Sequence, residues 1–305
     1  MLSRCRLHLN RCSRQATSFF FFLLLQTFVC ASTVSAQTVP RETLGKVKDS
    51  ALGELSGLIQ SNKYPNKFWT HNDSGDSARI FLIDNKAALE TTYWLSGIKA
   101  VDIEDIAKFK WEGRSYLVVA DIGDNLAVRN EVQLYIFEEP DWHAGLKDVH
   151  IPKEKIRTLR MRYPDKPRDA EALFVDPQSL TCYLISKRDF KVGLYAVNIM
   201  QSPSESILLE PKTNLPFTFI TSADISDDGR WILVKNLTEV FLWERNLGVS
   251  VVLTLQQKPI KLPYQPEPQG EAICFDQDSS VFYTISERPL GLDSYLYRYS
   301  INSID

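Results

Sequence analysis

The chain has 305 residues, with 35 lysines and arginines, 38 aspartates and glutamates, and a formal net charge of −3. This length is sufficient for one large all-β domain. A mildly acidic chain lacks the basic surface that nucleic-acid binding requires, so we predict no nucleic-acid partner.

The first 36 residues have the features of a secretory signal peptide. Four arginines precede an apolar run from Phe19 to Val29, and small residues at Val34-Ser-Ala36 predict cleavage before Gln37. The apolar run is short for a membrane span, although a retained signal anchor is an alternative. We therefore predict a secreted, extracellular monomer that consists of residues 37–305 as a single domain and has no membrane partner after cleavage.

Cleavage would lower the net charge to −7, because the segment carries four arginines and no acid, and it would remove three of the five cysteines. The remaining Cys182 and Cys274 fall in separate apolar segments, which favours buried free thiols over a disulfide. Sequons at Asn72-Asp-Ser74 and Asn236-Leu-Thr238 are compatible with an exported glycoprotein.

A short motif recurs along the chain at intervals of roughly 50 residues. In each copy, polar or acidic residues are followed by a short apolar run. Repetition with this period is typical of a β-propeller, in which four-stranded sheets surround a channel. The copies are Glu54-Leu-Ser-Gly-Leu-Ile59, Asp102-Ile-Glu-Asp-Ile-Ala107, Arg168-Asp-Ala-Glu-Ala-Leu-Phe-Val175, Ser222-Ala-Asp-Ile-Ser226 and Gly270-Glu-Ala-Ile-Cys-Phe275.

Each repeat contains short β-type runs separated by Gly, Asn, Asp and Pro clusters, which predict strands. In chain order the predicted strands are 58–59, 67–70, 78–83 and 89–95; 106–111, 115–120, 132–137 and 155–163; 172–175, 182–186, 193–199 and 206–209; 224–226, 231–235, 240–244 and 250–255; and 272–275, 281–286 and 294–300.

The last repeat lacks a fourth strand, and the segment 42–48 precedes the first repeat without a repeat of its own. We predict that this N-terminal segment completes the last sheet and closes a ring of five blades. Six blades are the alternative, because the long stretch 140–168 has room for an extra element. The only helical feature we expect is one turn within 141–146.

The loop that enters the first strand of a blade and the loop between strands two and three open on the same face. Entry positions from all five repeats therefore meet at one channel mouth. Carboxylates gathered there repel one another unless a cation neutralises them, and calcium accepts irregular oxygen ligands. The alternative is that these acids cap strand ends or face channel water. The predicted ligands of calcium, or of another divalent cation, are Ser56, Glu104, Glu171, Asp224 (or Ser222) and Glu271.

Loops between strands two and three add further polar residues to this mouth. Asp73, Asp121 and Asp124 are candidates for a catalytic base that activates water. Basic side chains in later blades suit a phosphorylated or carboxylated ligand, unless they are simply solvated. The predicted substrate-binding residues are Lys187, Arg188, Lys235 and Arg288.

The openings Glu-Leu-Ser-Gly-Leu, Asp-Ile-Glu-Asp-Ile, Asp-Ala-Glu-Ala-Leu and Gly-Glu-Ala-Ile resemble the secreted phytase-like (esterase-like-of-phytase) propeller family. The pattern His-Asn-Asp-Ser-Gly, Asp-Ile-Gly-Asp-Asn and Asp-Ala-Glu-Ala resembles related secreted bacterial propellers. More distantly, the series of channel residues resembles the five-bladed calcium-activated apyrases, which implies calcium ligation by Ser56, Glu104, Glu171 and Glu271. The fourth blade departs from that pattern, because Ala223 stands where a ligand oxygen is expected.

From these observations we predict a metal-dependent hydrolase of a phosphorylated small molecule, such as a nucleotide or another phosphoester. A non-catalytic extracellular binding propeller and a metal-dependent esterase or lactonase are the alternatives.

Overall fold

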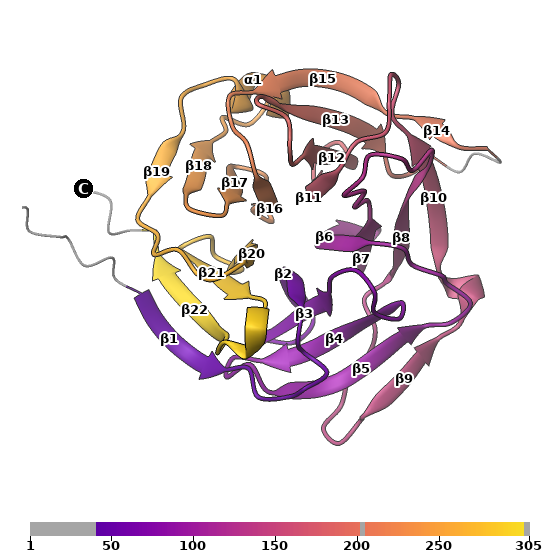
Figure 1. The fold of residues 1–305 in the computed structure, drawn as a ribbon, viewed down its shortest axis with the longest axis vertical. Coiled ribbons are helices and arrows are strands. Elements are labelled where there is room, and N and C mark those ends of the chain that lie inside the picture. Colours follow the sequence, from indigo (N-terminus) through magenta and orange to yellow (C-terminus); the bar gives the residue numbers. More distant parts are fainter. Residues whose placement is uncertain (1–40, 202–204, 302–305) are drawn as a thin grey trace, which may run out of the picture. The chain divides into compact units, whose positions relative to one another are not determined.

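In a computed structural model, which describes residues 41–201 and 205–301, the chain forms five β-sheets arranged in a ring (Figure 1). These residues belong to the compact unit Val39–Asp305. The predicted five-bladed all-β propeller is thus confirmed, while the predicted signal peptide lies outside the described residues.

In each blade, four neighbouring strands pair antiparallel from the channel outward. The first strands are β2 (Leu55–Gln60), β6 (Ile103–Trp111), β11 (Ala170–Asp176), β16 (Ile220–Ile225) and β20 (Gly270–Phe275). The second are β3 (Lys67–Asn72), β7 (Arg114–Asp121), β12 (Thr181–Ser186), β17 (Trp231–Asn236) and β21 (Val281–Ser286). The third are β4 (Arg79–Asp84), β8 (Val132–Glu138), β13 (Val192–Asn198), β18 (Val240–Glu244) and β22 (Tyr295–Ser300). The fourth are β5 (Leu89–Leu95), β10 (Arg157–Arg162), β15 (Glu210–Leu215), β19 (Ile260–Leu262) and β1 (Arg41–Lys46).

Ring closure follows the sequence prediction. The N-terminal strand β1 pairs antiparallel with β22, with Arg41 opposite Tyr299 and Lys46 opposite Tyr295. The guanidinium of Arg41 lies 3.9 Å from the ring centroid of Tyr297, which adds a cation–π contact. Blade 5 (β20, β21, β22 and β1) therefore joins the two ends of the ring (Figure 1).

Two predicted outer strands are wrong. In blade 3 (β11–β13 and β15), the fourth strand is β15 rather than 206–209, and its Pro211 is tolerated because β15 is an edge strand. In blade 4 (β16–β19), residues 250–255 form helix α1 (Val251–Leu255), and β19 is the fourth strand. Ser250 caps this helix by accepting a hydrogen bond from the Leu253 amide.

The long stretch 140–168 does contain an extra element, but it makes no sixth blade. Within it, β9 (Asp148–Ile151) leaves blade 2 (β6–β8 and β10) and pairs in parallel with β5 of blade 1 (β2–β5). The 3₁₀ turn η1 (Lys153–Lys155) leads back to β10, and β14 (Ile207–Leu208) pairs with the outer edge of β10. The crossing segment helps to line a cavity of about 730 Å³ with Trp111, Tyr116 and Ile136.

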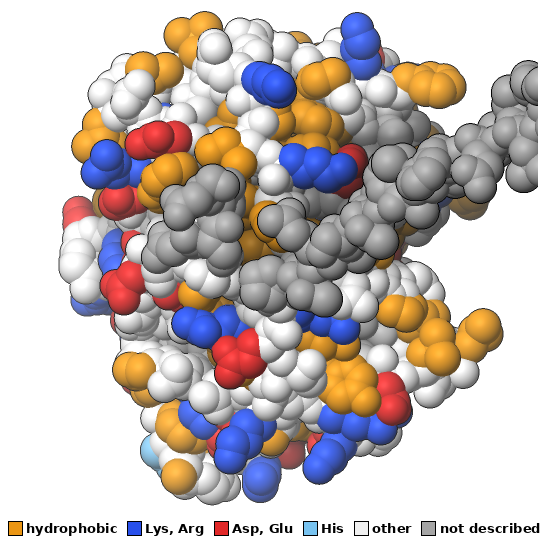
Figure 2. Space-filling view, turned by 90° about the vertical axis from the view of Figure 1, so that its left-hand side faces the viewer, with side chains coloured by type: hydrophobic (Ala, Val, Ile, Leu, Met, Phe, Trp, Pro, Cys, Tyr) orange, Lys and Arg blue, Asp and Glu red, His pale blue; other side chains and the backbone are white. Residues whose placement is uncertain are grey.

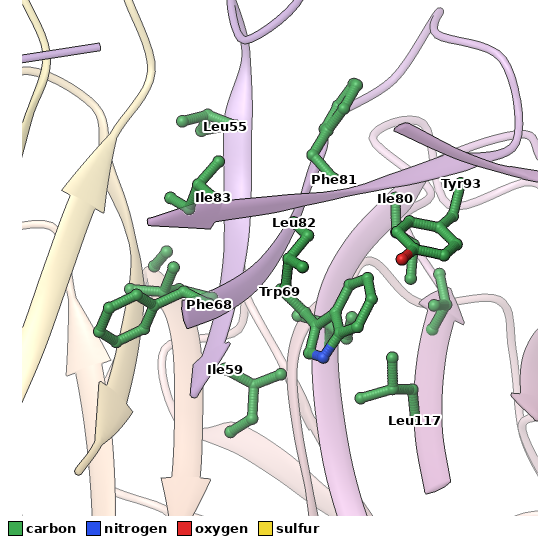
Figure 3. Packing of buried hydrophobic residues seen from close by; sticks show 14 of the residues in the cluster. Leu55, Ile59, Phe68, Trp69, Ile80, Phe81, Leu82, Ile83, Tyr93 and Leu117 are labelled. Atoms are coloured by element: carbon green, nitrogen blue, oxygen red, sulfur yellow. The ribbon is translucent and has the colours of Figure 1, made fainter. Parts of the chain in front are cut away.

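The core lies between neighbouring blades, and charged side chains are interspersed over the surface (Figure 2). In blade 1, Trp69 meets the Tyr93 ring edge-on, with 5.0 Å between the ring centroids (Figure 3). The ring centroid of Phe68 lies 4.8 Å from that of Tyr283 in blade 5. Cys182 and Cys274 are buried free thiols, as predicted. No helix in the described ranges is long and apolar enough to cross a membrane.

One completely buried carboxylate, Asp105 of β6, connects three blades across the channel. It accepts hydrogen bonds from the Leu173 amide of blade 3 at 3.0 Å and from the Ser222 hydroxyl of blade 4 at 3.2 Å. It also accepts the amide of its own neighbour Ile106 at 2.9 Å. Burial raises the pKa of Asp105 well above its usual range, despite these donors.

Replacing Asp105 with alanine should destabilise the protein by about 3 kcal/mol, because buried donors from two other blades would lose their acceptor. Asp105→Asn, which keeps one acceptor oxygen, should cost less. Urea unfolding would measure both, with Glu131→Ala at an exposed position as the control. Equal midpoints for Asp105→Ala and the control would contradict this account.

Candidate metal centre

Every inner strand carries a register shift near its start, where it pairs with the second strand of its blade. A bulge of this kind turns one unpaired side chain away from the ladder and is frequent beside functional sites. The shift leaves Glu104, Glu171, Thr221 and Glu271 unpaired in blades 2 to 5, and in blade 1 it spans Ser56 and Gly57. The predicted ligands of blades 2, 3 and 5 are therefore structurally equivalent, whereas the Ser56 hydroxyl of blade 1 donates to the Glu104 carbonyl at 2.8 Å.

In blade 4 the equivalent residue is Thr221, which the sequence analysis missed. Its side chain is buried, and its hydroxyl has no hydrogen-bond partner. Aligning Ile220-Thr-Ser-Ala with Ile103-Glu-Asp-Ile and Gly270-Glu-Ala-Ile would have found it. Of the two residues predicted instead, Ser222 binds Asp105, and Asp224 accepts the Phe275 amide of blade 5 at 2.8 Å.

Seven carboxylates gather at this end of the channel, and we refer to them as the acidic mouth. They form three groups in which the ligand atoms all lie within 4.8 Å of one another. Asp73 and Glu104 each belong to two groups, so the three groups are continuous. The groups are Asp73, Glu271 and Glu287; Asp73, Asp102 and Glu104; and Glu104, Asp169 and Glu171.

Two basic side chains already neutralise part of the acidic mouth. The ammonium of Lys187 contacts Glu171 and lies 3.9 Å from Glu271. Arg188 pairs with Asp169 at 2.5 Å. Among the described residues, no salt bridge reaches the second of these groups, which comprises Asp73, Asp102 and Glu104. The positive charges of Lys187 and Arg129 act on this set from a distance, without a direct ion pair.

Burial raises the pKa of several carboxyls in the acidic mouth. It raises the pKa of Asp102 to about 7, with the Asp73 charge as the next cause. Burial also raises the pKa of Glu171 and of Glu287 to about 8, although Lys187 acts against this for Glu171. The pKa of Glu104 is raised by burial and by the Glu171 charge. Protons or a bound cation must therefore stabilise this cluster.

The Asp73–Asp102–Glu104 set fits a hard divalent cation. All its side-chain donors are carboxylate oxygens, the ligands that calcium and magnesium prefer. Asp102 Oδ1 is buried and has no hydrogen-bond partner. Gly123 packs against the set so closely that a Cβ there would lie 2.1 Å from Glu104 Oε1. Position 123 of the segment Asp-Ile-Gly-Asp-Asn therefore requires glycine, the residue without a Cβ.

Of the three predicted catalytic bases, Asp73 alone belongs to the acidic mouth. Asp121 is completely buried, pairs with Arg129 at 2.8 Å and accepts the Tyr135 hydroxyl. Asp124 accepts the amides of the following loop, at Val128 and Arg129. These contacts give Asp121 and Asp124 the role of shaping the loop that carries Gly123.

Of the four predicted substrate-binding residues, two lie at the acidic mouth and two lie elsewhere. Lys187 and Arg188 lie at the acidic mouth, and Arg288 lines a neighbouring cavity of about 480 Å³ with Arg79. Lys235 is completely buried instead, where its ammonium donates to the carbonyls of Gly270 and Asn236. It therefore links β17 to β20 and is inaccessible to a ligand.

His71, at the end of β3, is another buried polar group near these inner strands. Its Nδ1 lies 2.9 Å from the Asn72 carbonyl, and its Nε2 has no partner. Burial lowers its pKa to about 4. A Cβ on Gly57 would lie 2.2 Å from Nε2, so Gly57 makes room for the imidazole.

Neither the comparison with protein-family models nor the search of curated proteins gives a match. The resemblance to phytase-like propellers and apyrases therefore has no support beyond the motifs themselves. The fold and the acidic mouth define the chain as a five-bladed β-propeller with a candidate metal centre at one end of its channel.

The raised carboxyl pKa values predict that the metal-free protein loses stability as pH rises. Folded carboxyls keep protons that the unfolded chain has lost above its usual values of 3.8 and 4.5, so the unfolding free energy falls up to about pH 8. His71 has the opposite effect, because its pKa is lowered in the folded protein, so it makes the unfolding free energy rise with pH. This rise ends near the usual histidine pKa of 6.5. Between pH 6.5 and 8 the acids should dominate, with a loss on the order of 1 kcal/mol per carboxyl.

Thermal melts in EDTA at the two ends of this range would measure the loss. Glu287→Gln should reduce the difference, because it removes one of these carboxyls, whereas the exposed Glu138→Gln should leave it unchanged. A melting temperature that is constant or rises across this range would contradict the assignment.

Proposed function

We propose that the acidic mouth binds a divalent cation, with calcium as the first candidate, and hydrolyses a phosphorylated small molecule outside the cell. The observation that carries this proposal is the set Asp73, Asp102 and Glu104, which lacks a salt bridge, lies beside Lys187 and Arg188, and has an unpartnered buried oxygen on Asp102. Carboxylates next to a lysine and an arginine suit a cation and a phosphate bound side by side.

Asp102 and Glu104 would hold the cation, which would supply charge neutralisation and polarise a phosphoryl oxygen. Arg188, whose side chain is 48% exposed, would bind another phosphate oxygen, with Lys187 beside it. Asp73 has a raised pKa, mainly through burial, and would accept the proton of the attacking water. Glu287, whose pKa is raised mainly by burial, would give its proton to the leaving oxygen as the phosphorus–oxygen bond breaks.

A non-catalytic binding propeller is the second candidate, and Lys187 is the observation that favours it. Its ammonium contacts Glu171 and lies near Glu271, so part of the mouth is neutralised without any metal. An esterase or lactonase that uses the same cation to polarise a carbonyl is a third possibility from the sequence.

Calcium should raise the melting temperature of the wild-type protein by several degrees, because it binds the folded state alone. Asp102→Asn and Glu104→Gln should abolish this shift. Asp224→Asn is the matched control, since that carboxylate binds backbone amides and should leave the calcium effect intact. If calcium and EDTA give the same melting temperature, the metal centre is refuted.

With calcium present, we expect turnover of at least one member of a panel of nucleoside diphosphates, phytate, aryl esters and lactones, with phosphoesters preferred. Arg188→Gln should raise KM roughly tenfold, because a charged hydrogen bond to the ligand is lost. Arg114→Gln, which removes an exposed ion pair with Glu138 at the other end of blade 2, should leave KM unchanged. No turnover of any compound would favour the binding propeller.

A further inference from the structure

The cavity of about 730 Å³ beside the crossing segment lies at the end of blade 2 that is remote from the acidic mouth. Strand β6 runs from Glu104 at the mouth to Trp111 at the cavity. These two residues are seven positions apart in an extended strand, a distance of about 23 Å. A volume of this size is typical of pockets that hold a small organic molecule. The cavity is therefore a second candidate site, separate from the metal centre.

Three aromatic side chains form one wall of this cavity. Phe109 and Tyr116 are directly opposite each other on β6 and β7, and their rings stack with 5.1 Å between the centroids and 14° between the planes. The ring centroid of Trp111 lies 6.3 Å from that of Tyr116. Trp111 remains 37% exposed, so other side chains do not close this wall. Planar aromatic molecules stack on such surfaces.

The strand pairing brings cationic side chains to the same face of blade 2. Arg157 of β10 is opposite Ile136 of β8, and Ile136 is opposite Val118 of β7, two positions from Tyr116. Residues that are paired in this way share one face of the sheet. Lys155 lies two positions before Arg157, and both line the cavity with Tyr116. Two strand spacings, about 10 Å, separate Tyr116 from Arg157, which a two-ring aromatic acid can span.

Most other charges along the cavity are already paired. The third acid of the lining, Glu139, is buried and accepts the indole N–H of Trp69 in blade 1 at 2.8 Å. It therefore faces blade 1, on the other side of the sheet from Arg157. Two ion pairs account for the remaining two acids: Arg114 with Glu138 at 3.2 Å, and Lys63 with Asp141 at 3.0 Å.

Arg157 and Lys155 are the cations that these pairs leave over. The Arg157 guanidinium donates to the carbonyls of Ile199 and Gln201, which carry no charge. Lys155 is exposed, and within the described ranges neither side chain forms a salt bridge. Burial lowers the pKa of Arg157, and no described carboxylate offsets this effect. A half-buried guanidinium beside an aromatic wall favours a carboxylate ligand.

We propose that this cavity binds an aromatic carboxylate, a planar small molecule of about two rings with one carboxylate group. Its rings stack on Trp111 and Tyr116, and its carboxylate accepts hydrogen bonds from Arg157 and Lys155. An aliphatic acid would not use the ring faces, and a neutral aromatic molecule would leave both cations without a counter-charge. The site does not depend on the proposed hydrolysis, because it lies at the other end of blade 2.

Equilibrium dialysis of the purified protein against 2-naphthoate tests this proposal. The comparison probes are neutral 2-naphthylmethanol, which keeps the rings, and octanoate, which keeps the carboxylate. We expect 2-naphthoate to bind at least about tenfold more tightly than either. Its affinity should be the same in calcium and in EDTA, since the acidic mouth is remote. Lack of 2-naphthoate binding, or equal affinity for the three probes, would overturn the proposal.

Variants assign the two halves of the site. Trp111→Ala should weaken binding about tenfold, and Trp111→Phe, which keeps a ring, should weaken it less. Lys155→Gln should weaken it about fivefold, because one exposed cation is lost. The matched control is Lys153→Gln, which removes the same charge from the same turn η1 at a position that does not line the cavity. It should bind as the wild type does.

Arg157→Gln should weaken 2-naphthoate binding more than Lys155→Gln does, because the guanidinium is half-buried beside the rings. Its melting temperature must be measured too, since Arg157 also holds the carbonyls of Ile199 and Gln201. If that variant is unfolded, Lys155→Gln and Trp111→Ala decide, because both positions are exposed. Equal affinity in Lys155→Gln and Lys153→Gln, or wild-type affinity in Trp111→Ala, would contradict the assigned site.

Discussion

The β-bulge at the start of each inner strand determines both the ring and its candidate site. It turns one side chain per blade towards the mouth, which gives Glu104, Glu171 and Glu271 equivalent positions. The next residue then faces the neighbouring blades, as Asp105 and Ser222 do when they bond across the channel. Without the extra residue, the alternation of the strand would reverse the two roles. Local backbone geometry thus positions the acids and the contacts between blades at once.

Repulsion between the carboxylates limits how much negative charge the acidic mouth can carry. Seven carboxylates in a partly buried cluster cannot all remain charged without compensation, and the protein supplies only part of it. Lys187 and Arg188 compensate the side formed by blades 3 and 5. The side formed by blades 1 and 2, with Asp73, Asp102 and Glu104, receives no such partner among the described residues. The mouth is therefore asymmetric, with cationic side chains paired to the carboxylates on one side and, within the described ranges, carboxylates without a direct cationic partner on the other.

The inner parts of the propeller were predictable from the sequence because burial imposes short apolar runs with polar entries, and those repeat. Glu104, Glu171 and Glu271 were found in this way. The outer strands could not be predicted in this way. An edge strand need not be apolar, and not all of its backbone amides form hydrogen bonds within the sheet, so β15 can contain Pro211. Thr221 was not predicted because it is uncharged, whereas the prediction relied on the acidic residues at the equivalent positions of the other blades. The burial of Lys235 depends on carbonyls distant in the sequence, which no local pattern reveals.

The pairing of β1 with β22 also sets an order of events. The ion pair between Glu42 and Arg298 joins residues 256 positions apart, so the first described strand waits for the last one to be synthesised. Until then blade 5 lacks its outer strand and the nascent chain is an open arc with an unpaired edge. The ring can therefore close only after β22 has been made, and until then the outer edge of β22 is an unpaired strand edge that can pair with another chain.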